Sequence, residues 1–295
     1  MEFPNYFADA ESDFKNAEYV IFGVPYDKTG SFRRGTKKAP YSIRQASWNF
    51  ESYSLLTDVD LKETKIHDYG DINLPDNQDS LKMKKQVIDL TRKIIVNKKI
   101  PIAIGGEHSI TQPIIDVFKK EKDEFGVVIL DAHLDFRGSY ENNPENHACI
   151  SKRISDLIGS RNISILGVRS GTKEEFKEAE KLGLFFINSF DINKNGIEWA
   201  IQKTLKNFDK KHIYLSLDFD VIDPSFAPGT STPEPFGLNP FDILRCIEAF
   251  SSQIIGFDIV EVCPPYDKGE TAILAAKLIR YTIEQSWLNK GSRLI

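Results

Sequence analysis

Short, almost continuously apolar runs alternate along this chain with longer segments in which apolar residues recur at helical spacing. Runs with little apolar-polar alternation are typical of strands that helices cover on both faces. The alternation therefore predicts an α/β fold with a parallel, doubly wound sheet. The sequence contains eight short runs of this kind, most of them continuously apolar, at Tyr19–Val24, Lys65–Tyr69, Pro101–Ile104, Val127–Leu130, Ile163–Val168, Leu184–Ile187, Ile213–Leu217 and Ile254–Val260.

The segments between these runs are predicted to be helices. Asn239 and Pro240 supply an N-cap followed by proline at the first helical position. Asp71–Ser80 and Asp223–Leu238 are predicted to be long loops, and no repeat or linker interrupts the chain, so residues 1–295 are predicted to form a single domain. The predicted helices are Ser80–Lys98, Gln112–Lys122, Ala148–Ile158, Lys173–Leu182, Ile197–Phe208, Pro240–Phe250 and Glu270–Trp287.

The charge and cysteine content exclude several classes of protein. A net charge of −5 argues against a nucleic-acid partner, which would require a basic stripe, and suits a small cationic substrate. The three cysteines, Cys149, Cys246 and Cys263, form no paired motif and indicate reduced thiols. The N-terminal residues do not resemble a signal peptide and no run approaches 18 apolar residues, so we expect a cytoplasmic protein without a membrane partner.

Ligand-type side chains follow three of the predicted strands. In parallel sheets, ligands bind outside the carboxyl ends of the strands. The run Val127–Leu130 continues into Asp131, His133 and Asp135. Alternate residues of extended backbone share a face, so we expect these three side chains to converge.

Two further motifs stand at predicted strand ends. His108 follows a run that ends in Gly105 and Gly106, and the glycines permit a tight turn or a close backbone approach. Asp218 and Asp220 follow Ile213–Leu217 at alternate positions. Singly, each motif is more often a turn, a cap or a structural histidine, and it is their joint occurrence at three strand ends that indicates a site.

Together the motifs supply two imidazoles and four carboxylates. This ligand set suits two divalent cations, and Mn²⁺ fits it better than zinc, which more often recruits thiolates or more histidines. Without cations, four carboxylates gathered in one pocket would repel one another. The predicted metal ligands are His108, Asp131, His133, Asp135, Asp218 and Asp220.

The motifs resemble those of the ureohydrolase family, which contains the arginases and agmatinases. The family signatures stand here as GGEHS (105–109), DAHLD (131–135) and SLDFDVIDPSFAPGTSTP (216–233), and GVPYD (23–27), RRGTKKAPYSIR (33–44) and DIVEVCPPYD (258–267) extend the resemblance over most of the chain. The resemblance implies a three-layer αβα fold with a central, mainly parallel eight-stranded sheet. It also implies two Mn²⁺ per subunit bridged by water or hydroxide, and a homo-oligomer, either a trimer or a hexamer.

The resemblance also implies a role for each residue. Asp131 and Asp218 would bridge the two metals. His108 and Asp135 would complete the ligands of one metal, and His133 and Asp220 those of the other. Asp220 would in addition relay a proton. Beyond the ligands, Glu261 would bind the substrate guanidinium through a bidentate contact, and His147 would shuttle protons at the mouth of the site.

The segments VPYD, HACISKRI and EVCPPYD resemble agmatinases, in particular the archaeal type. This implies cleavage of agmatine to urea and putrescine, a reaction of polyamine biosynthesis. In the loop 136–146, Glu141 and Glu145 suit an amine tail, whereas Arg137 could contact a carboxylate. Aminopropylagmatine ureohydrolase and arginase remain alternatives. A non-catalytic, metal-binding regulatory subunit is disfavoured because such proteins generally lose ligands, and all six are present.

Three positions depart from the family pattern. Ser231 replaces a usual glycine, Phe236 replaces the first glycine of a common pair, and Glu107 stands where aspartate is frequent. None is a predicted ligand. The two loop changes, at Ser231 and Phe236, leave the tail of the substrate open.

Overall fold

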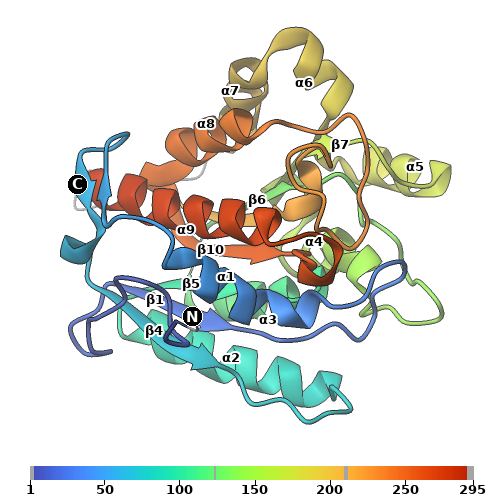
Figure 1. The fold of residues 1–295 in the computed structure, drawn as a ribbon. Coiled ribbons are helices and arrows are strands. Elements are labelled where there is room, and N and C mark those ends of the chain that lie inside the picture. The colour runs from blue at the N-terminus through green and yellow to red at the C-terminus, as the bar shows by residue number, and fades with distance from the viewer. Residues whose placement is uncertain (1–2, 123, 209–211, 291–295) are drawn as a thin grey trace.

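An eight-stranded sheet forms the centre of the computed structural model, which describes residues 3–122, 124–208 and 212–290 (Figure 1). The strand order is β4-β1-β5-β10-β9-β6-β7-β8, and every pairing is parallel. The predicted α/β fold and its eight strands are confirmed. The strands are β1 (Tyr19–Gly23), β4 (Ile66–Asp71), β5 (Ile100–Ile104), β6 (Gly126–Leu130), β7 (Ile163–Val168), β8 (Phe185–Asn188), β9 (Ile213–Asp218) and β10 (Ile254–Val260).

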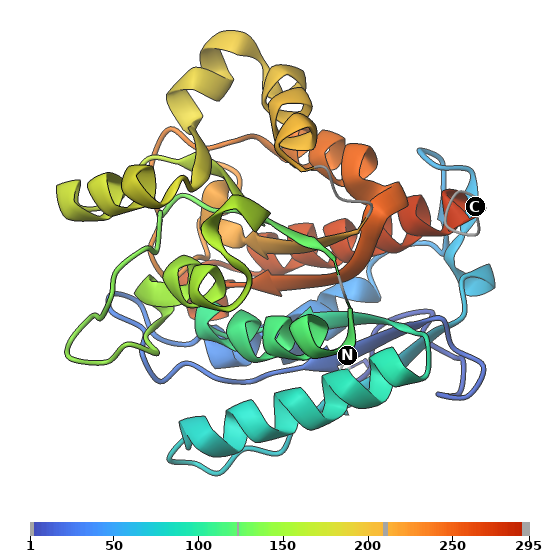
Figure 2. The ribbon, with the colours of Figure 1, turned by 180° about the vertical axis from the view of Figure 1, so that it is seen from behind.

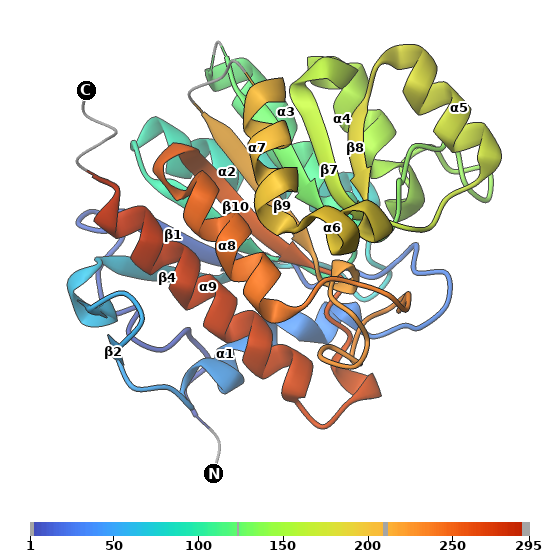
Figure 3. The same ribbon diagram turned by 90° about the horizontal axis from the view of Figure 1, so that it is seen from above.

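Helices cover both faces of the sheet and give three layers (Figure 3). Helices α1, α6, α7, α8 and α9 lie over one face, and α2, α3, α4 and α5 over the other, where α2 and α3 run side by side (Figure 2). No described helix is long and apolar enough to cross a membrane. The helices are α1 (Ala39–Ser47), α2 (Ser80–Val96), α3 (Thr111–Glu121), α4 (Ile150–Ile158), α5 (Lys173–Leu182), α6 (Ser189–Asn195), α7 (Ile197–Asn207), α8 (Pro240–Phe250) and α9 (Glu270–Leu288).

The central strands are buried on both faces, which explains their apolar sequences. In β6, Val128 and Leu130 join the core under one helical layer, whereas Val127 and Ile129 join the core under the other. Removing such a side chain from water stabilises the fold by about 1.5–3 kcal/mol. A polar residue inside these strands would therefore need a buried partner.

The predicted elements match the structure to within two residues at their ends. Asn239 caps α8 as predicted, since its side chain accepts hydrogen bonds from the backbone N–H groups of Phe241 and Asp242. Helices α1 and α6 and a two-stranded ribbon, β2 (Tyr53–Ser54) with β3 (Val59–Asp60), were not predicted. The buried face of α1 includes Arg44, which interrupts the apolar spacing of that helix.

The order of the strands gathers the motifs at one edge. Strands β9 and β10 return to positions between β5 and β6, so β5, β10, β9 and β6 are consecutive neighbours. Their carboxyl ends carry the GGEHS, DIVEV, DFD and DAHLD segments. Residues that are more than 150 positions apart thus lie at the ends of adjacent strands.

A buried ion pair fastens α1 to the edge strand β4. The Arg44 side chain is fully buried and donates to Asp68 through Nε at 2.7 Å and a terminal nitrogen at 2.9 Å, and it also contacts Asp71. The backbone N–H of Phe7 donates to the same Asp68 carboxylate at 2.7 Å. Breaking a buried pair by removing one partner leaves an uncompensated charge.

We predict that Arg44→Met lowers the free energy of unfolding by about 3–5 kcal/mol, because Asp68 would stay buried without its cation. Urea denaturation followed by circular dichroism measures the change. Arg245→Met is the matched control, since Arg245 pairs with Glu198 on the surface and its loss should change stability by about 0–1 kcal/mol. Equal effects of the two substitutions would contradict the prediction.

Candidate metal centre

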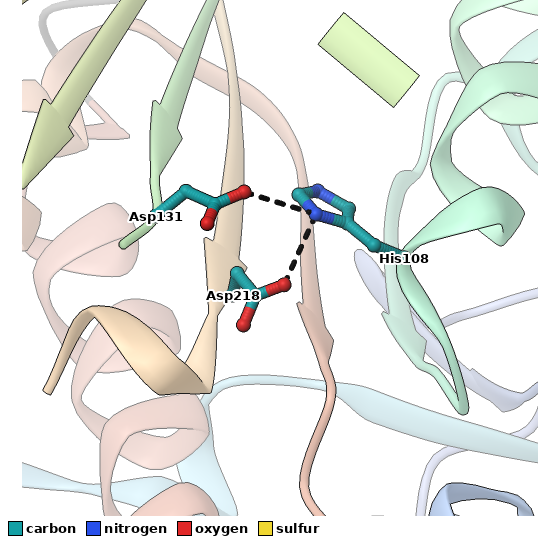
Figure 4. A group of neighbouring side chains, drawn as sticks. All are labelled: His108, Asp131 and Asp218. Atoms are coloured by element: carbon teal, nitrogen blue, oxygen red, sulfur yellow. Dashed lines mark ion pairs between the residues drawn. The ribbon is translucent and has the colours of Figure 1, made fainter. Parts of the chain in front are cut away.

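His108, Asp131 and Asp218 converge from three strand ends (Figure 4). His108 opens a 3₁₀ turn after β5, Asp131 directly follows β6, and Asp218 is the last residue of β9. The Nδ1 atom of His108 lies 3.2 Å from an oxygen of Asp131 and 3.1 Å from an oxygen of Asp218. Asp135 approaches the same nitrogen at 3.7 Å.

A second group forms around His133. Its Nδ1 atom lies 2.9 Å from Asp220 and 3.7 Å from Asp131. Each of the two groups, His108-Asp131-Asp218 and Asp131-His133-Asp220, has ligand atoms close enough to hold one cation, and Asp131 belongs to both. The structure therefore brings all six predicted ligands together, although Asp135 joins neither group and Asp218 only the first.

The backbone that achieves this convergence differs from the predicted one. Strand β6 ends at Leu130, so Asp131, His133 and Asp135 do not share an extended face. Asp135 has a left-handed backbone with φ of 49°, and Asp220 lies in a 3₁₀ turn. The expectation of convergence was correct, but its reason, a continuing strand, was wrong.

Burial and mutual repulsion act on the aspartates. Burial, together with the charges of Asp220 and Asp131, raises the pKa of Asp218 well above its usual range, and burial likewise raises the pKa of Asp135. Burial also acts to raise the pKa of Asp220, but the His133 contact outweighs it and lowers that pKa. Cations placed between these groups would favour the ionised carboxylates.

Two buried atoms lack a hydrogen bond where a cation would sit. Nδ1 of His108 and the facing oxygen of Asp131 are 3.2 Å apart, yet neither makes a hydrogen bond within the described residues. Buried polar atoms are rarely left unpaired. The pair fits a metal ion as the common partner.

The protonation of His108 fits the same interpretation. Ser216 donates its only hydroxyl proton to the buried Asp258 at 2.6 Å, and its oxygen lies 3.1 Å from Nε2 of His108. The hydroxyl oxygen can then only accept from the ring, so Nε2 carries the proton. In the neutral ring the free lone pair is therefore on Nδ1, which faces Asp131 and Asp218, and this is the form that binds a metal ion.

Glu261 follows β10 with a left-handed backbone, φ 62°, and lines the cavity beside the aspartates. One carboxylate oxygen accepts from the backbone N–H of His108 at 2.7 Å, and the other accepts from the hydroxyl of Ser231. Burial raises the pKa of Glu261 to about 7. Ser231, which stands where the family usually has glycine, therefore holds the Glu261 carboxylate. The sequence alone showed only that a side chain replaces the glycine.

His147 lines the same cavity, which has a volume of about 180 Å³. Its Nδ1 atom lies 3.0 Å from the hydroxyl oxygen of Thr29, and the backbone N–H of His147 donates to that oxygen at 3.1 Å. Burial lowers the pKa of His147 below its usual value. The imidazole thus lines the same cavity as Asp135, Asp218 and Asp220 and contacts the Thr29 hydroxyl.

The position of the loop 136–146 contradicts the expectation that Glu141 and Glu145 face the amine tail of a substrate. Glu141 and Glu145 line a different cavity, and Glu145 pairs with Lys84. Arg137, in contrast, lines the cavity of the candidate site, where its Nε lies 3.0 Å from Glu175. The two glutamates therefore do not form the wall that meets a substrate tail.

Arg169 holds the long loop over the site, a role that no sequence motif predicts. Its guanidinium donates to the carbonyl oxygens of Asp220 at 2.6 Å, Glu234 at 2.7 Å and Pro235 at 3.0 Å. Glu234 in turn lies 3.7 Å from Nε2 of His133. A carboxylate behind a histidine ligand orients the ring, so Arg169 fixes this contact indirectly.

The structure is that of an α/β protein with two carboxylate-rich ligand groups that could each hold a metal ion, and known proteins share its fold. Residues 17–284 match the Arginase family, and the chain belongs to that family. The agmatinase of Pyrococcus horikoshii is 38% identical over 93% of this chain and 94% of its own length. The N(1)-aminopropylagmatine ureohydrolase of Thermococcus kodakarensis is also 38% identical, over 91% of each chain.

A solved structure agrees with these relatives. The agmatine ureohydrolase of Thermoplasma volcanium superposes with a TM-score of 0.92 and 41% identity, covering 99% of this chain and 97% of that one. The prediction of an agmatinase-like ureohydrolase with the arginase-type fold is confirmed.

We predict that Ser216→Ala weakens Mn²⁺ binding about 10- to 100-fold, because His108 would lose the partner that fixes its protonated nitrogen. Isothermal titration calorimetry on metal-stripped protein measures the affinity. Ser164→Ala is the control, since Ser164 is equally buried in β7 and contacts Asn207 instead of a predicted ligand. Unchanged affinity in Ser216→Ala would refute the assigned orientation of His108.

Proposed function

We propose that this protein hydrolyses agmatine to urea and putrescine at a pair of Mn²⁺ ions. The observation that carries the proposal is the sharing of Asp131 by two ligand groups, whose members Asp218 and Asp220 line a cavity together with Glu261. In the reaction, water adds to the guanidinium carbon and the bond from that carbon to the tail nitrogen breaks. The departing amine takes up a proton, so that the products are urea and a diamine.

The six ligands would hold the ions, with His108 and Asp135 on one side and His133 and Asp220 on the other. Asp131 and Asp218 would lie between the ions. Two divalent cations balance four carboxylates in charge. When bound, such cations lower the pKa of a shared water and so supply a nucleophile at neutral pH.

Glu261 would bind and orient the substrate. A planar guanidinium presents parallel N–H groups that match the two oxygens of a carboxylate. The contacts from the His108 backbone and the Ser231 hydroxyl fix the Glu261 side chain before the substrate arrives. The carboxylate is therefore held in one orientation, which aims the guanidinium carbon at the metal ligands.

Asp220 and His147 would move the protons. Asp220 has one oxygen 3.0 Å from the Thr232 hydroxyl and 2.9 Å from His133. His147 would carry a proton between solvent and the departing amine, since an imidazole exchanges protons near neutral pH.

The cavity and the relatives support an amine tail. Its lining contains Asp135, Glu175, Asp218, Asp220 and Glu261 as acids. Against them stands one arginine, whose guanidinium lies beside Glu175 and 4.6 Å from the Tyr140 ring centroid. Relatives named for agmatine and for aminopropylagmatine are equally similar to this chain, so the longer amine is the second candidate. The intact ligand set favours an enzyme over a non-catalytic regulatory subunit.

The proposal also covers the domain organisation, the location and the oligomeric state of the protein. We expect residues 1–295 to act as one catalytic domain. We also expect a cytoplasmic homo-oligomer, a trimer or a hexamer.

We predict that Asp131→Ala and Asp218→Ala each abolish urea release while the fold is retained. Each removes a carboxylate that would contact both ions, and removing one of several repelling buried charges does not destabilise the metal-free protein. Urea production with added Mn²⁺, metal content by mass spectrometry and circular dichroism measure the outcome. Glu198→Ala, at an exposed acid on α7, should keep full activity. Turnover by either aspartate variant would rule out the assignment.

We predict that kcat/KM for agmatine exceeds that for arginine about ten- to hundredfold. The two differ by one carboxylate, and a charged hydrogen bond forgone is worth about 1.5–3 kcal/mol. A urea assay over agmatine, aminopropylagmatine, guanidinobutyrate and arginine measures the ratio. Replacing Glu141 and Glu145 with glutamine should leave it unchanged, because both line the other cavity. Equal use of arginine and agmatine would place the protein on another branch of the family.

A further inference from the structure

The imidazole of His147 is held by a hydroxyl that is itself held by a buried carboxylate. Thr29 stands between His147 and Glu107: its hydroxyl oxygen lies 3.0 Å from Nδ1 of His147 and 2.6 Å from an oxygen of Glu107. This arrangement lies outside the metal ligands and has no role in the chemistry described so far.

Glu107 is fully buried, and its partners are all donors. The backbone N–H of Thr29 donates to one oxygen at 2.5 Å, and the hydroxyls of Thr29 and Ser109 donate to the other, each at 2.6 Å. No positively charged side chain pairs with it among the described residues. These three donors match lone pairs on both oxygens of the carboxyl group, which would be strongly unfavourable to bury without such partners.

The hydrogen bonds of Thr29 determine which ring nitrogen of His147 carries the proton. A hydroxyl has one proton to donate and two lone pairs to accept with. The proton goes to Glu107, one lone pair accepts from the backbone N–H of His147, and the other faces Nδ1. Nδ1 can therefore only donate, so in the neutral ring Nε2 is the unprotonated nitrogen.

We propose that Thr29 and Glu107 are positioning residues that fix His147 with its proton on Nδ1 and its free lone pair on Nε2, the nitrogen available to the cavity. The role rests on the proposed function of His147 as proton carrier. Nε2 takes a proton from solvent and gives it to the departing amine nitrogen, while Nδ1 keeps its own proton throughout. Ring and hydroxyl thus return unchanged after each turnover.

The first test compares two substitutions at Thr29 in the Mn²⁺-loaded enzyme. Thr29→Val keeps the branched shape but removes the hydroxyl, and its kcat for agmatine should fall at least about tenfold. KM should change less than about threefold, because no substrate contact is lost. Thr29→Ser restores the hydroxyl and should keep kcat within about twofold of the wild type. Full activity in Thr29→Val, or an equal loss in Thr29→Ser, would overturn the proposal.

The second test reads the ring directly and does not depend on turnover. The chain has five histidines, so long-range ¹⁵N–¹H correlation spectra of ¹⁵N-histidine-labelled, metal-free protein are sparse, and His147→Gln assigns the signal. We expect the proton on Nδ1 in the wild type and on Nε2, or shared, in Thr29→Val. A wild-type His147 protonated on Nε2 would reject the proposal, even if agmatine is hydrolysed.

The two tests also separate this proposal from the proposed function. If no guanidino compound is hydrolysed, the proposed function fails and the spectrum still decides the orientation of His147. If Thr29→Val fails to fold, the wild-type spectrum decides alone.

Discussion

The close packing of buried aspartates is the constraint on which the site depends. Four carboxylates at the ends of β6 and β9 share a region with little water, where like charges repel strongly. Backbone N–H groups relieve part of this: those of His133 and Asp220 donate to Asp131 and Asp218 at 2.6 Å and 3.0 Å. One oxygen of Asp131 still faces His108 without a hydrogen bond. The fold thus stabilises most of the negative charge locally and leaves the rest for cations.

The protonated nitrogen of His108 and that of His147 are determined by the same kind of hydrogen-bond chain, but a different ring nitrogen carries the proton in each. A hydroxyl stands between ring and carboxylate in both cases, Ser216 before Asp258 and Thr29 before Glu107. Because the hydroxyl gives its proton to the carboxylate, it accepts from the ring and fixes which nitrogen is protonated. His108 thereby keeps Nδ1 free toward the aspartates, whereas His147 keeps Nε2 free. At Nδ1 of His147, an uncharged hydroxyl achieves this without a full negative charge directly against the ring, which would favour the imidazolium.

The sequence predicted those parts of the molecule whose signal is local. Continuous apolar runs indicate strands buried on both faces, and the ligand motifs directly follow such runs. The sheet and the metal-ligand motifs were therefore predictable. Helix α1 was not predictable in this way. Arg44 occupies its buried face, and an arginine can be buried there only because it pairs with Asp68 of strand β4. The position of Glu141 depended on the path of a loop, which neighbouring residues do not determine. Long-range hydrogen bonds such as Ser231 to Glu261 were likewise invisible until the fold had brought them together.

Backbone strain explains how one of these side chains reaches the cavity at all. In a continuing strand, successive side chains would alternate between the two helical layers. Glu261 instead adopts φ of 62°, a conformation that costs a residue other than glycine about 1–3 kcal/mol. Its backbone N–H donates to Gly106 at 2.9 Å and its carbonyl accepts from Ser231 at 3.3 Å. Gly106 also packs against the backbone of Tyr26, where a Cβ would lie 1.9 Å from the Tyr26 carbonyl oxygen. The carbonyl of Gly106 therefore holds the bend that ends β10, where Glu261 leaves the extended conformation and its carboxylate meets the backbone N–H of His108.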